Sequence, residues 1–107
     1  MGLLDMFKSP DINAGVVTFQ NTPGAVLLDV RTTQEYAYRR IPRSVNLPLQ
    51  DLSRISDLVP DPATPLFVYC FSGGRSSQAV KQLKSMGYTA VTNIGGISDY
   101  RGPFACE

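Results

Sequence analysis

The chain has 107 residues, of which 43% are hydrophobic and 18% charged, values typical of one folded globular domain rather than of a disordered chain. Ten basic and nine acidic residues leave a net charge of +1, and no row of lysines and arginines alternates with aromatic residues, so no nucleic acid partner is expected. Two cysteines and no histidine argue against a disulfide framework and against a zinc site, and no motif calls for a cofactor.

The first ten residues, MGLLDMFKSP, are mildly apolar but contain neither a basic n-region nor a long apolar run. They therefore predict neither a signal peptide nor a membrane span. We expect a cytoplasmic protein without membrane contacts, whose thiols stay reduced. The length favours a single domain over residues 1–107.

Turn-rich stretches separate segments with helical or extended patterns. Apolar residues recur at helical spacing after Asp11, and residues 32–35, Thr-Thr-Gln-Glu, resemble the capping box that starts a helix. Continuous apolar runs at 25–30 and 66–69 predict strands buried on both faces. In chain order we expect a helix from residues 9–11 to about residue 21, a strand at 25–30, a short helix at 32–38, a strand at 45–47, a helix at 49–58, a strand at 66–69, a helix at 76–86, a strand at 90–94 and a short terminal helix.

Alternating strands and helices are typical of an α/β domain with a mainly parallel sheet and right-handed crossovers. In such sheets binding sites form beyond the carboxyl ends of the strands. Asp29 and Cys70 both lie at the carboxyl ends of predicted strands. The sequence therefore places both residues at the edge of the sheet where chemistry is expected.

The segment at residues 69–77, YCFSGGRSS, is the most informative part of the chain. Gly73 and Gly74 permit positive φ values and close backbone approach, so that successive amide N–H groups can point at one spot. The helix that begins near Ser76 adds a partial positive charge. In such surroundings the pKa of a cysteine falls from ~8.5 to roughly 3.5–7.5, and Arg75 supplies a permanent cation. Without histidine, the Cys70 thiolate has to be generated by the loop and Arg75.

A cysteine after a buried strand is usually an inert core residue, and the glycines, arginine and serines that follow Cys70 favour a reactive one instead. The GxxxxGK[ST] spacing of a nucleotide-binding P-loop is absent. Cys106 lies one residue from the end of the given sequence, and we expect it to be a bystander. The alternative is a resolving thiol that attacks a sulfur carried by Cys70.

Residues 70–76, CFSGGRS, resemble the active-site loop of the rhodanese family, in which a cysteine is followed by a glycine and then by Arg-Ser. Further segments fit the family in the same order, over about residues 9–103: LLDVR at 27–31, Glu35-Tyr36, Ile41-Pro42, NLPL at 46–49, Leu83 with Gly87-Tyr88, and NIGGI at 93–97. The resemblance implies a rhodanese-like domain with its core at about residues 9–103. It also implies a mainly parallel sheet of about five strands, flanked by helices on both faces.

The same resemblance implies a sulfurtransferase that moves a sulfane sulfur from thiosulfate or a persulfide donor to a thiol or cyanide acceptor. In the family's scheme the Cys70 thiolate attacks the donor, forms a persulfide and passes the sulfur on in a double displacement. A protein of a sulfur relay is a further implied partner. The residues implied around the sulfur are those of the loop: Phe71, Ser72, Gly73, Gly74, Arg75 and Ser76.

Three charged residues are expected to support the loop rather than to touch the substrate. Asp29 and Arg31 would tie the first strand to the loop by ion pairs or hydrogen bonds, and Glu35 would line its rim. The chain also departs from the family. Phe71 stands where a polar residue is frequent, so that a contact to thiosulfate is missing. The arginines Arg39, Arg40 and Arg43 form either a docking patch for an acidic partner or a solvated face.

Two other classes of protein remain open. The first is a cysteine-dependent phosphatase or arsenate reductase of the same fold, which resembles rhodaneses but needs one more residue between cysteine and arginine and usually has histidine before the cysteine. In this chain four residues separate Cys70 from Arg75, and Tyr69 precedes. The second is a non-catalytic interaction module of the same fold, a class that typically lacks the cysteine.

Overall fold

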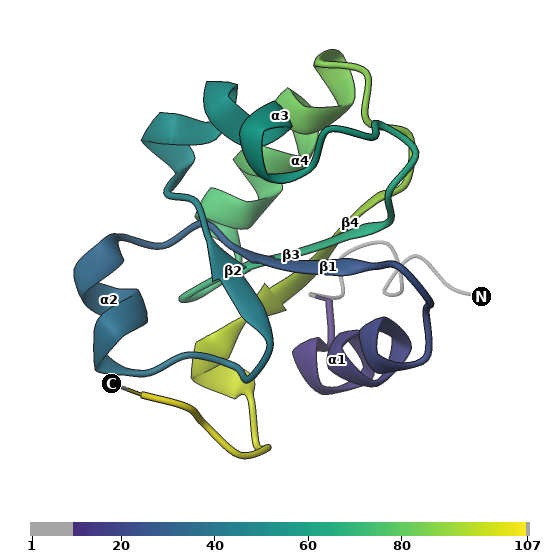
Figure 1. Ribbon diagram of the computed structural model, residues 1–107. Helices are drawn as coiled ribbons and strands as arrows, with labels where there is room; N and C mark the ends of the chain where they lie inside the picture. The colour runs from purple at the N-terminus through teal and green to yellow at the C-terminus, as the bar shows by residue number, and fades with distance from the viewer. Residues whose placement is uncertain (1–9, 107) are drawn as a thin grey trace, which may run out of the picture.

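The computed structural model describes residues 10–106, which form a four-stranded parallel sheet with helices on both faces (Figure 1). The strands are β1 (Val26–Asp29), β2 (Ser44–Asn46), β3 (Leu66–Cys70) and β4 (Val91–Gly96), in the spatial order β2-β1-β3-β4. The α/β class with a parallel sheet is confirmed. The expected count of about five strands is wrong. Each extended run that the sequence pattern predicts becomes one strand, and residues 40 and 105 add only an isolated antiparallel bridge.

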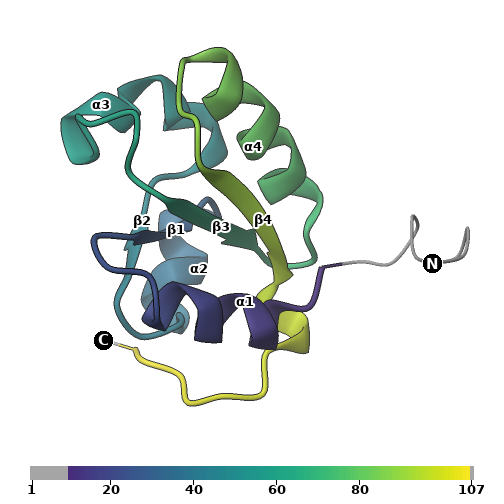
Figure 2. The same cartoon turned by 90° about the vertical axis from the view of Figure 1, so that its right-hand side faces the viewer.

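The helices lie in two layers because successive side chains of a strand point to opposite faces (Figure 2). Leu27, Phe67 and Tyr69 pack against α1 (Ile12–Gln20). Leu28, Val68 and Cys70 pack on the other face, which is covered by the 3₁₀ helix η2 (Leu49–Arg54), by α3 (Ile55–Leu58) and by α4 (Gly74–Ser85). The helix α2 (Thr33–Tyr38) follows β1, and the short 3₁₀ helix η3 (Ile97–Asp99) follows β4. Cys70 therefore belongs to the core under α4.

Local signals placed two helix starts correctly. Asp11 caps α1, its carboxylate accepting a hydrogen bond from the amide of Asn13, while the expected contribution of Ser9 lies outside the described residues. Thr32 and Glu35 form the predicted capping box of α2. No helix in residues 10–106 is long and apolar enough to cross a membrane.

The strands β1, β2 and β3 agree with the expected ranges to within one residue at each end, and three other elements differ more. The helix expected at 49–58 is a 3₁₀ turn followed by one short α-helical turn, and α4 begins at Gly74 rather than at residue 76. The last strand continues through Gly96, because Gly95 adopts a φ of +107° and forms part of a bulge. At this bulge the strand partners shift from Val68–Asn93 to Tyr69–Gly95. The bulge carries β4 past the carboxyl end of β3, where Cys70 lies.

Candidate active site

Cys70 lies at the carboxyl end of β3, one of the two central strands, and its residue is 1% exposed. The chain then turns through Gly73, whose φ of +104° requires glycine, and enters α4 at Gly74. This is the strand–loop–helix arrangement that the sequence predicts. It points the first amide groups of α4 back toward the cysteine sulfur.

The Cys70 sulfur is surrounded by hydrogen-bond donors. The amide N–H groups of Gly73 and Ser76 donate to Sγ, at 3.0 and 3.3 Å, and the Ser76 hydroxyl lies 3.5 Å away. Burial raises the pKa of the Cys70 thiol, but hydrogen bonds from the Ser76 hydroxyl and from the amides of Ser76, Gly73 and Ser72 outweigh it. The net effect lowers the pKa, so the loop favours a thiolate.

The other loop residues differ in how exposed they are to solvent. Ser76 is fully buried, whereas the Phe71 side chain is 49% exposed, and Ser72 and Gly74 lie at the surface. The loop backbone rests on β4: a Cβ atom added to Gly96 would meet the Phe71 carbonyl oxygen and lie 2.6 Å from the Ser72 Cα. A glycine is therefore required where the strand passes under the loop.

Arg75 is held by Glu35 rather than directed at the sulfur. Its Nη1 and Nη2 donate to the two carboxylate oxygens of Glu35, at 2.8 and 3.0 Å. These hydrogen bonds lower the pKa of Glu35 to about 2. The same carboxylate accepts a hydrogen bond from the Thr32 amide in the capping box. Glu35 thus lies at the rim of the loop and connects α2 to the start of α4.

Asp29 and Arg31 form a buried ion pair with each other. Arg31 Nη2 donates to Asp29 Oδ2 at 2.6 Å and to the carbonyl oxygen of Arg39 at 2.8 Å. The Arg31 backbone amide also donates to Asp29 Oδ1 at 2.8 Å. This pair shapes the chain as it leaves β1. The ion pair of Glu35 with Arg75 connects the following helix, α2, to the Cys70 loop.

Asn93 is a site residue that the sequence pattern did not single out. Its Oδ1 lies 2.8 Å from the Ser76 hydroxyl and accepts a hydrogen bond from the Gly95 amide at 3.0 Å. Asn93 therefore contacts the side chain that contacts the sulfur. The available signal was an amide side chain in a predicted strand, two residues before the glycine pair Gly95-Gly96.

Comparison with known proteins identifies the family to which this chain belongs. The sequence profile of the rhodanese-like domain matches residues 15–102. The chain belongs to the rhodanese-like family. It is 39% identical over 77 residues to the thiosulfate sulfurtransferase PspE of Escherichia coli, covering 71% of this chain and 74% of PspE.

Two further relatives support the same conclusion. The chain is 39% identical over 94 residues to the adenylyltransferase and sulfurtransferase uba4 of Ogataea parapolymorpha, covering 87% of this chain but only 24% of that longer protein. A solved structure described as a rhodanese with anions from E. coli aligns with a TM-score of 0.72 at 36% identity, over 78% of this chain and 99% of that one. The protein is a sulfurtransferase, the class that the resemblance to the rhodanese family implied.

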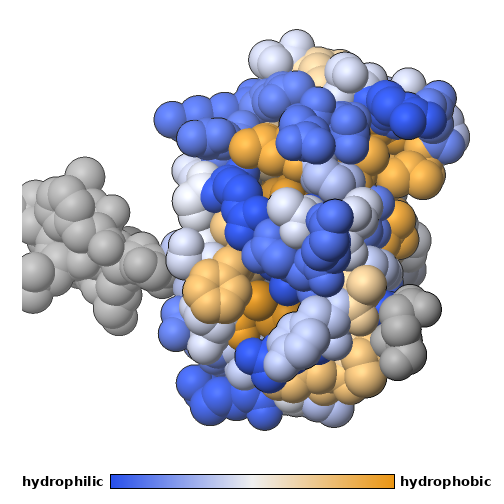
Figure 3. All heavy atoms as spheres, turned by 90° about the vertical axis from the view of Figure 1, so that its left-hand side faces the viewer, coloured by the Kyte–Doolittle hydropathy of each residue, from blue (hydrophilic) through white to orange (hydrophobic). Residues whose placement is uncertain are grey.

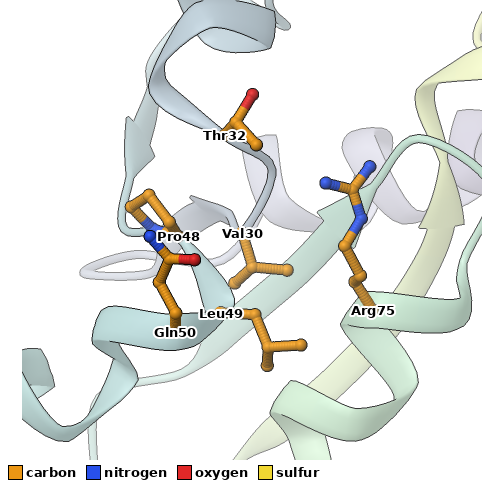
Figure 4. Close-up of a pocket in the computed structure, with 6 residues that line it drawn as sticks. All are labelled: Val30, Thr32, Pro48, Leu49, Gln50 and Arg75. Carbon is orange, nitrogen blue, oxygen red and sulfur yellow. The ribbon is translucent and has the colours of Figure 1, made fainter.

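Two surface cavities flank the ion pair of Glu35 and Arg75. The larger, of about 320 Å³, includes Arg75 in its lining (Figure 4). The smaller, of about 160 Å³, includes Glu35 and the exposed side chains of Phe71 and Tyr38. On the side of the molecule that carries α2, apolar surface shows between polar and charged residues (Figure 3). Arg75 thus borders one cavity and Glu35 the other.

Three arginines after α2 each lie over a different aromatic ring. Their Cζ atoms are 4.3 to 5.0 Å from the ring centroids, with Arg39 over Phe104, Arg40 over Tyr36 and Arg43 over Phe19. Cation–π contacts of this kind give each guanidinium a partner within the chain. Within residues 10–106, no group of three or more His, Cys, Asp or Glu side chains is placed to hold a metal ion.

Proposed function

We propose that this sulfurtransferase takes a sulfane sulfur from thiosulfate or a persulfide donor and passes it to a thiol or to cyanide through a persulfide on Cys70. One observation carries the proposal. The Cys70 sulfur is buried and accepts hydrogen bonds from the amides of Gly73 and Ser76, a set of donors suited to an anionic sulfur.

The first half-reaction would be a displacement at sulfur. The Cys70 thiolate attacks the outer sulfur of thiosulfate, a new S–S bond forms, and the old S–S bond breaks with its electron pair leaving on sulfite. The two reactants together carry three negative charges, as do the persulfide anion and sulfite. The backbone amides of residues 71–76 would hold the transferred sulfur, and Ser76 would donate to it from its hydroxyl.

No proton acceptor would be required at the moment of attack, because the attacking species is the thiolate, which the hydrogen bonds of the loop favour by lowering the pKa of Cys70. The chain has no histidine. Hydrogen bonds from Ser76, Gly73 and Ser72 lower the pKa of Cys70. We infer that these loop groups, more than the Arg75 cation, favour the thiolate. Arg75 would act at the rim, where it meets incoming anions while Glu35 holds its position.

The free thiols of the chain bear on the compartment in which the protein works. We infer that residues 1–107 form one rhodanese-like domain with its core at about 9–103, which works in the cytoplasm beside a sulfur donor, a thiol acceptor and a relay protein. Cys70 is buried, and both it and Cys106 are free thiols. Free thiols are expected where the surroundings are reducing.

The two cysteines allow a matched test of the persulfide. Incubation with thiosulfate should add one sulfur atom to the intact mass of the wild-type protein and of Cys106→Ser, and a reducing agent should remove it. Cys70→Ser should show no added sulfur and no transfer to cyanide, while keeping the circular dichroism spectrum of the folded protein. Appreciable transfer by a folded Cys70→Ser protein would refute the proposal.

A further inference from the structure

The larger cavity adjoins the strand end that carries Cys70. The Val30 amide donates to the Tyr69 carbonyl oxygen at 3.0 Å, and the Leu49 amide donates to the Val30 carbonyl oxygen at 3.1 Å. Val30 lines the cavity and is thus hydrogen-bonded to the residue before Cys70, and Leu49, which also lines the cavity, is hydrogen-bonded to Val30. A ligand in the cavity would lie beside the loop that holds the sulfur.

The size and lining of this cavity suit an organic molecule better than a small inorganic anion. Its volume of about 320 Å³ reaches the lower end of the range for small-molecule sites, roughly 300–1,000 Å³. The cavity is lined by apolar surface from Val30, Pro48 and Leu49. Contact with this surface does not stabilise a bound hydrated dianion such as thiosulfate. An aliphatic chain would bury its carbon atoms against the same surface.

Polar groups occupy opposite walls of the cavity (Figure 4). Arg75 lies on one side and Gln50 on the other, with Val30 and Leu49 between them. Glu35 takes one N–H from each terminal nitrogen of Arg75, and the remaining N–H groups, including that of Nε, have no partner among the described residues. Arg75 can therefore bind a second carboxylate.

We propose that this cavity binds the organic thiol that removes the sulfur, and that it selects a small aliphatic thiol carrying a carboxylate. The inference rests on the Cys70 persulfide proposed above. The thiol first loses its proton to the solvent. Its thiolate then attacks the outer sulfur, the new S–S bond forms, and the electron pair of the broken bond returns to Cys70. One organic persulfide and one Cys70 thiolate result, with two negative charges on sulfur and one on the carboxylate on each side of the reaction. In the reverse direction the cavity would hold an organic persulfide as donor.

The test separates the two half-reactions. The protein is loaded with sulfur from thiosulfate, freed of excess donor and mixed with mercaptopropionate, with cysteamine or with cyanide, and loss of the added sulfur is followed by intact mass. Gln50 is exposed in the first turn of η2, so Gln50→Trp fills the cavity without entering the core, and Gln50→Glu adds a negative charge opposite Arg75. Gln20→Trp, at the exposed end of α1 on the other face of the sheet, is the matched control.

In Gln50→Trp, the ratio of the mercaptopropionate rate constant to the cyanide rate constant should fall by about tenfold, because cyanide is too small to need the cavity. In Gln50→Glu, the preference for mercaptopropionate over cysteamine should fall by about tenfold. Gln20→Trp should keep the wild-type ratios. Unchanged ratios in both Gln50 variants would overturn the inference and leave the persulfide proposal intact. A wild-type protein that takes up no sulfur would instead contradict the proposed function.

Discussion

Ser76 has one hydroxyl proton and three acceptors within reach. Asn93 Oδ1 is the nearest at 2.8 Å, the Gly73 carbonyl oxygen lies at 3.1 Å, and the Cys70 sulfur at 3.5 Å. While the hydroxyl donates to Asn93, it can only accept from Cys70, which favours the thiol. When it turns to the sulfur, it stabilises the thiolate. Asn93, the Gly73 carbonyl and Cys70 therefore compete for one proton.

This competition predicts opposite effects of two alanine substitutions. Ser76→Ala should raise the pKa of Cys70, because a donor to the thiolate is lost. Asn93→Ala should lower it, because the hydroxyl loses its nearest acceptor and donates more often to the sulfur. Below the pKa, the rate of Cys70 alkylation should fall several-fold in the first variant and rise in the second. The rate is measured with iodoacetamide across the pH range.

Ser77→Ala is the matched control, because Ser77 is the neighbouring exposed serine of α4. Its profile should follow the wild type. Arg75→Ala should move the profile less than Ser76→Ala, since the guanidinium is bound to Glu35. If the Asn93 and Ser76 variants shift in the same direction, Asn93 only supports the structure of the bulge.

Between elements, the contact that sets the rim of the site is the ion pair from α2 to the first turn of α4. The Glu35 carboxylate accepts a hydrogen bond from Arg75 in α4. It also accepts one from the Thr32 amide and so caps its own helix, α2. The side chains are 31% and 37% exposed, so solvent screens part of their attraction. The pair nevertheless fixes where the free N–H groups of Arg75 point.

The pKa of Glu35 makes this contact dependent on pH. Its folded-state pKa of about 2 lies below the ordinary 4.5, so its contribution to stability is present above pH 4.5 and is lost as the pH falls from there toward 2. Glu35→Gln should have a lower Tm than the wild type at about pH 6, and the difference should narrow toward about pH 3. Thermal unfolding followed by circular dichroism measures the Tm of both proteins at each pH.

Arg75→Ala should show the same narrowing, because Glu35 then loses the partner that lowers its pKa. A Tm difference between Glu35→Gln and wild type that stays constant over this range would show that the ion pair does not couple the two helices.

On the scale of the whole molecule, the strand order places β1 and β3 in the centre and brings their carboxyl ends to one edge. The buried pair of Asp29 and Arg31 lies at this edge, and the Arg31 guanidinium is 5.7 Å from the centroid of the Tyr69 ring. Arg31 also donates a hydrogen bond to the carbonyl oxygen of Arg39, the residue after α2. The pair thus joins the two central strands to the segment that carries Glu35.

Asp29→Asn should destabilise the protein by about 3–5 kcal/mol, because it leaves the Arg31 charge buried without a counter-charge. Asp57→Asn breaks an exposed pair with Arg54, whose side chain is 73% exposed, and should cost at most about 0.5 kcal/mol. Urea unfolding measures both free energies. Equal costs for the two variants would show that the buried pair does not stabilise the sheet edge.

The amino-acid sequence by itself determined the features that a few neighbouring residues control. The apolar runs gave the strands, Asp11 and Thr32 gave two helix starts, and the glycines after Cys70 gave the loop. These follow from side-chain periodicity, hydrogen bonds between near neighbours and the backbone freedom of glycine, all of which act over a few residues.

Only the tertiary structure decided which distant side chains meet. Glu35 and Arg75 are 40 residues apart and Ser76 and Asn93 are 17 apart, and each pair forms because neighbouring parallel strands end at one edge of the sheet. The cavity beside Cys70 depends in the same way on how β1, η2 and α4 pack. Such contacts depend on strand order, on the bulge in β4 and on helix packing, which no short stretch of sequence specifies.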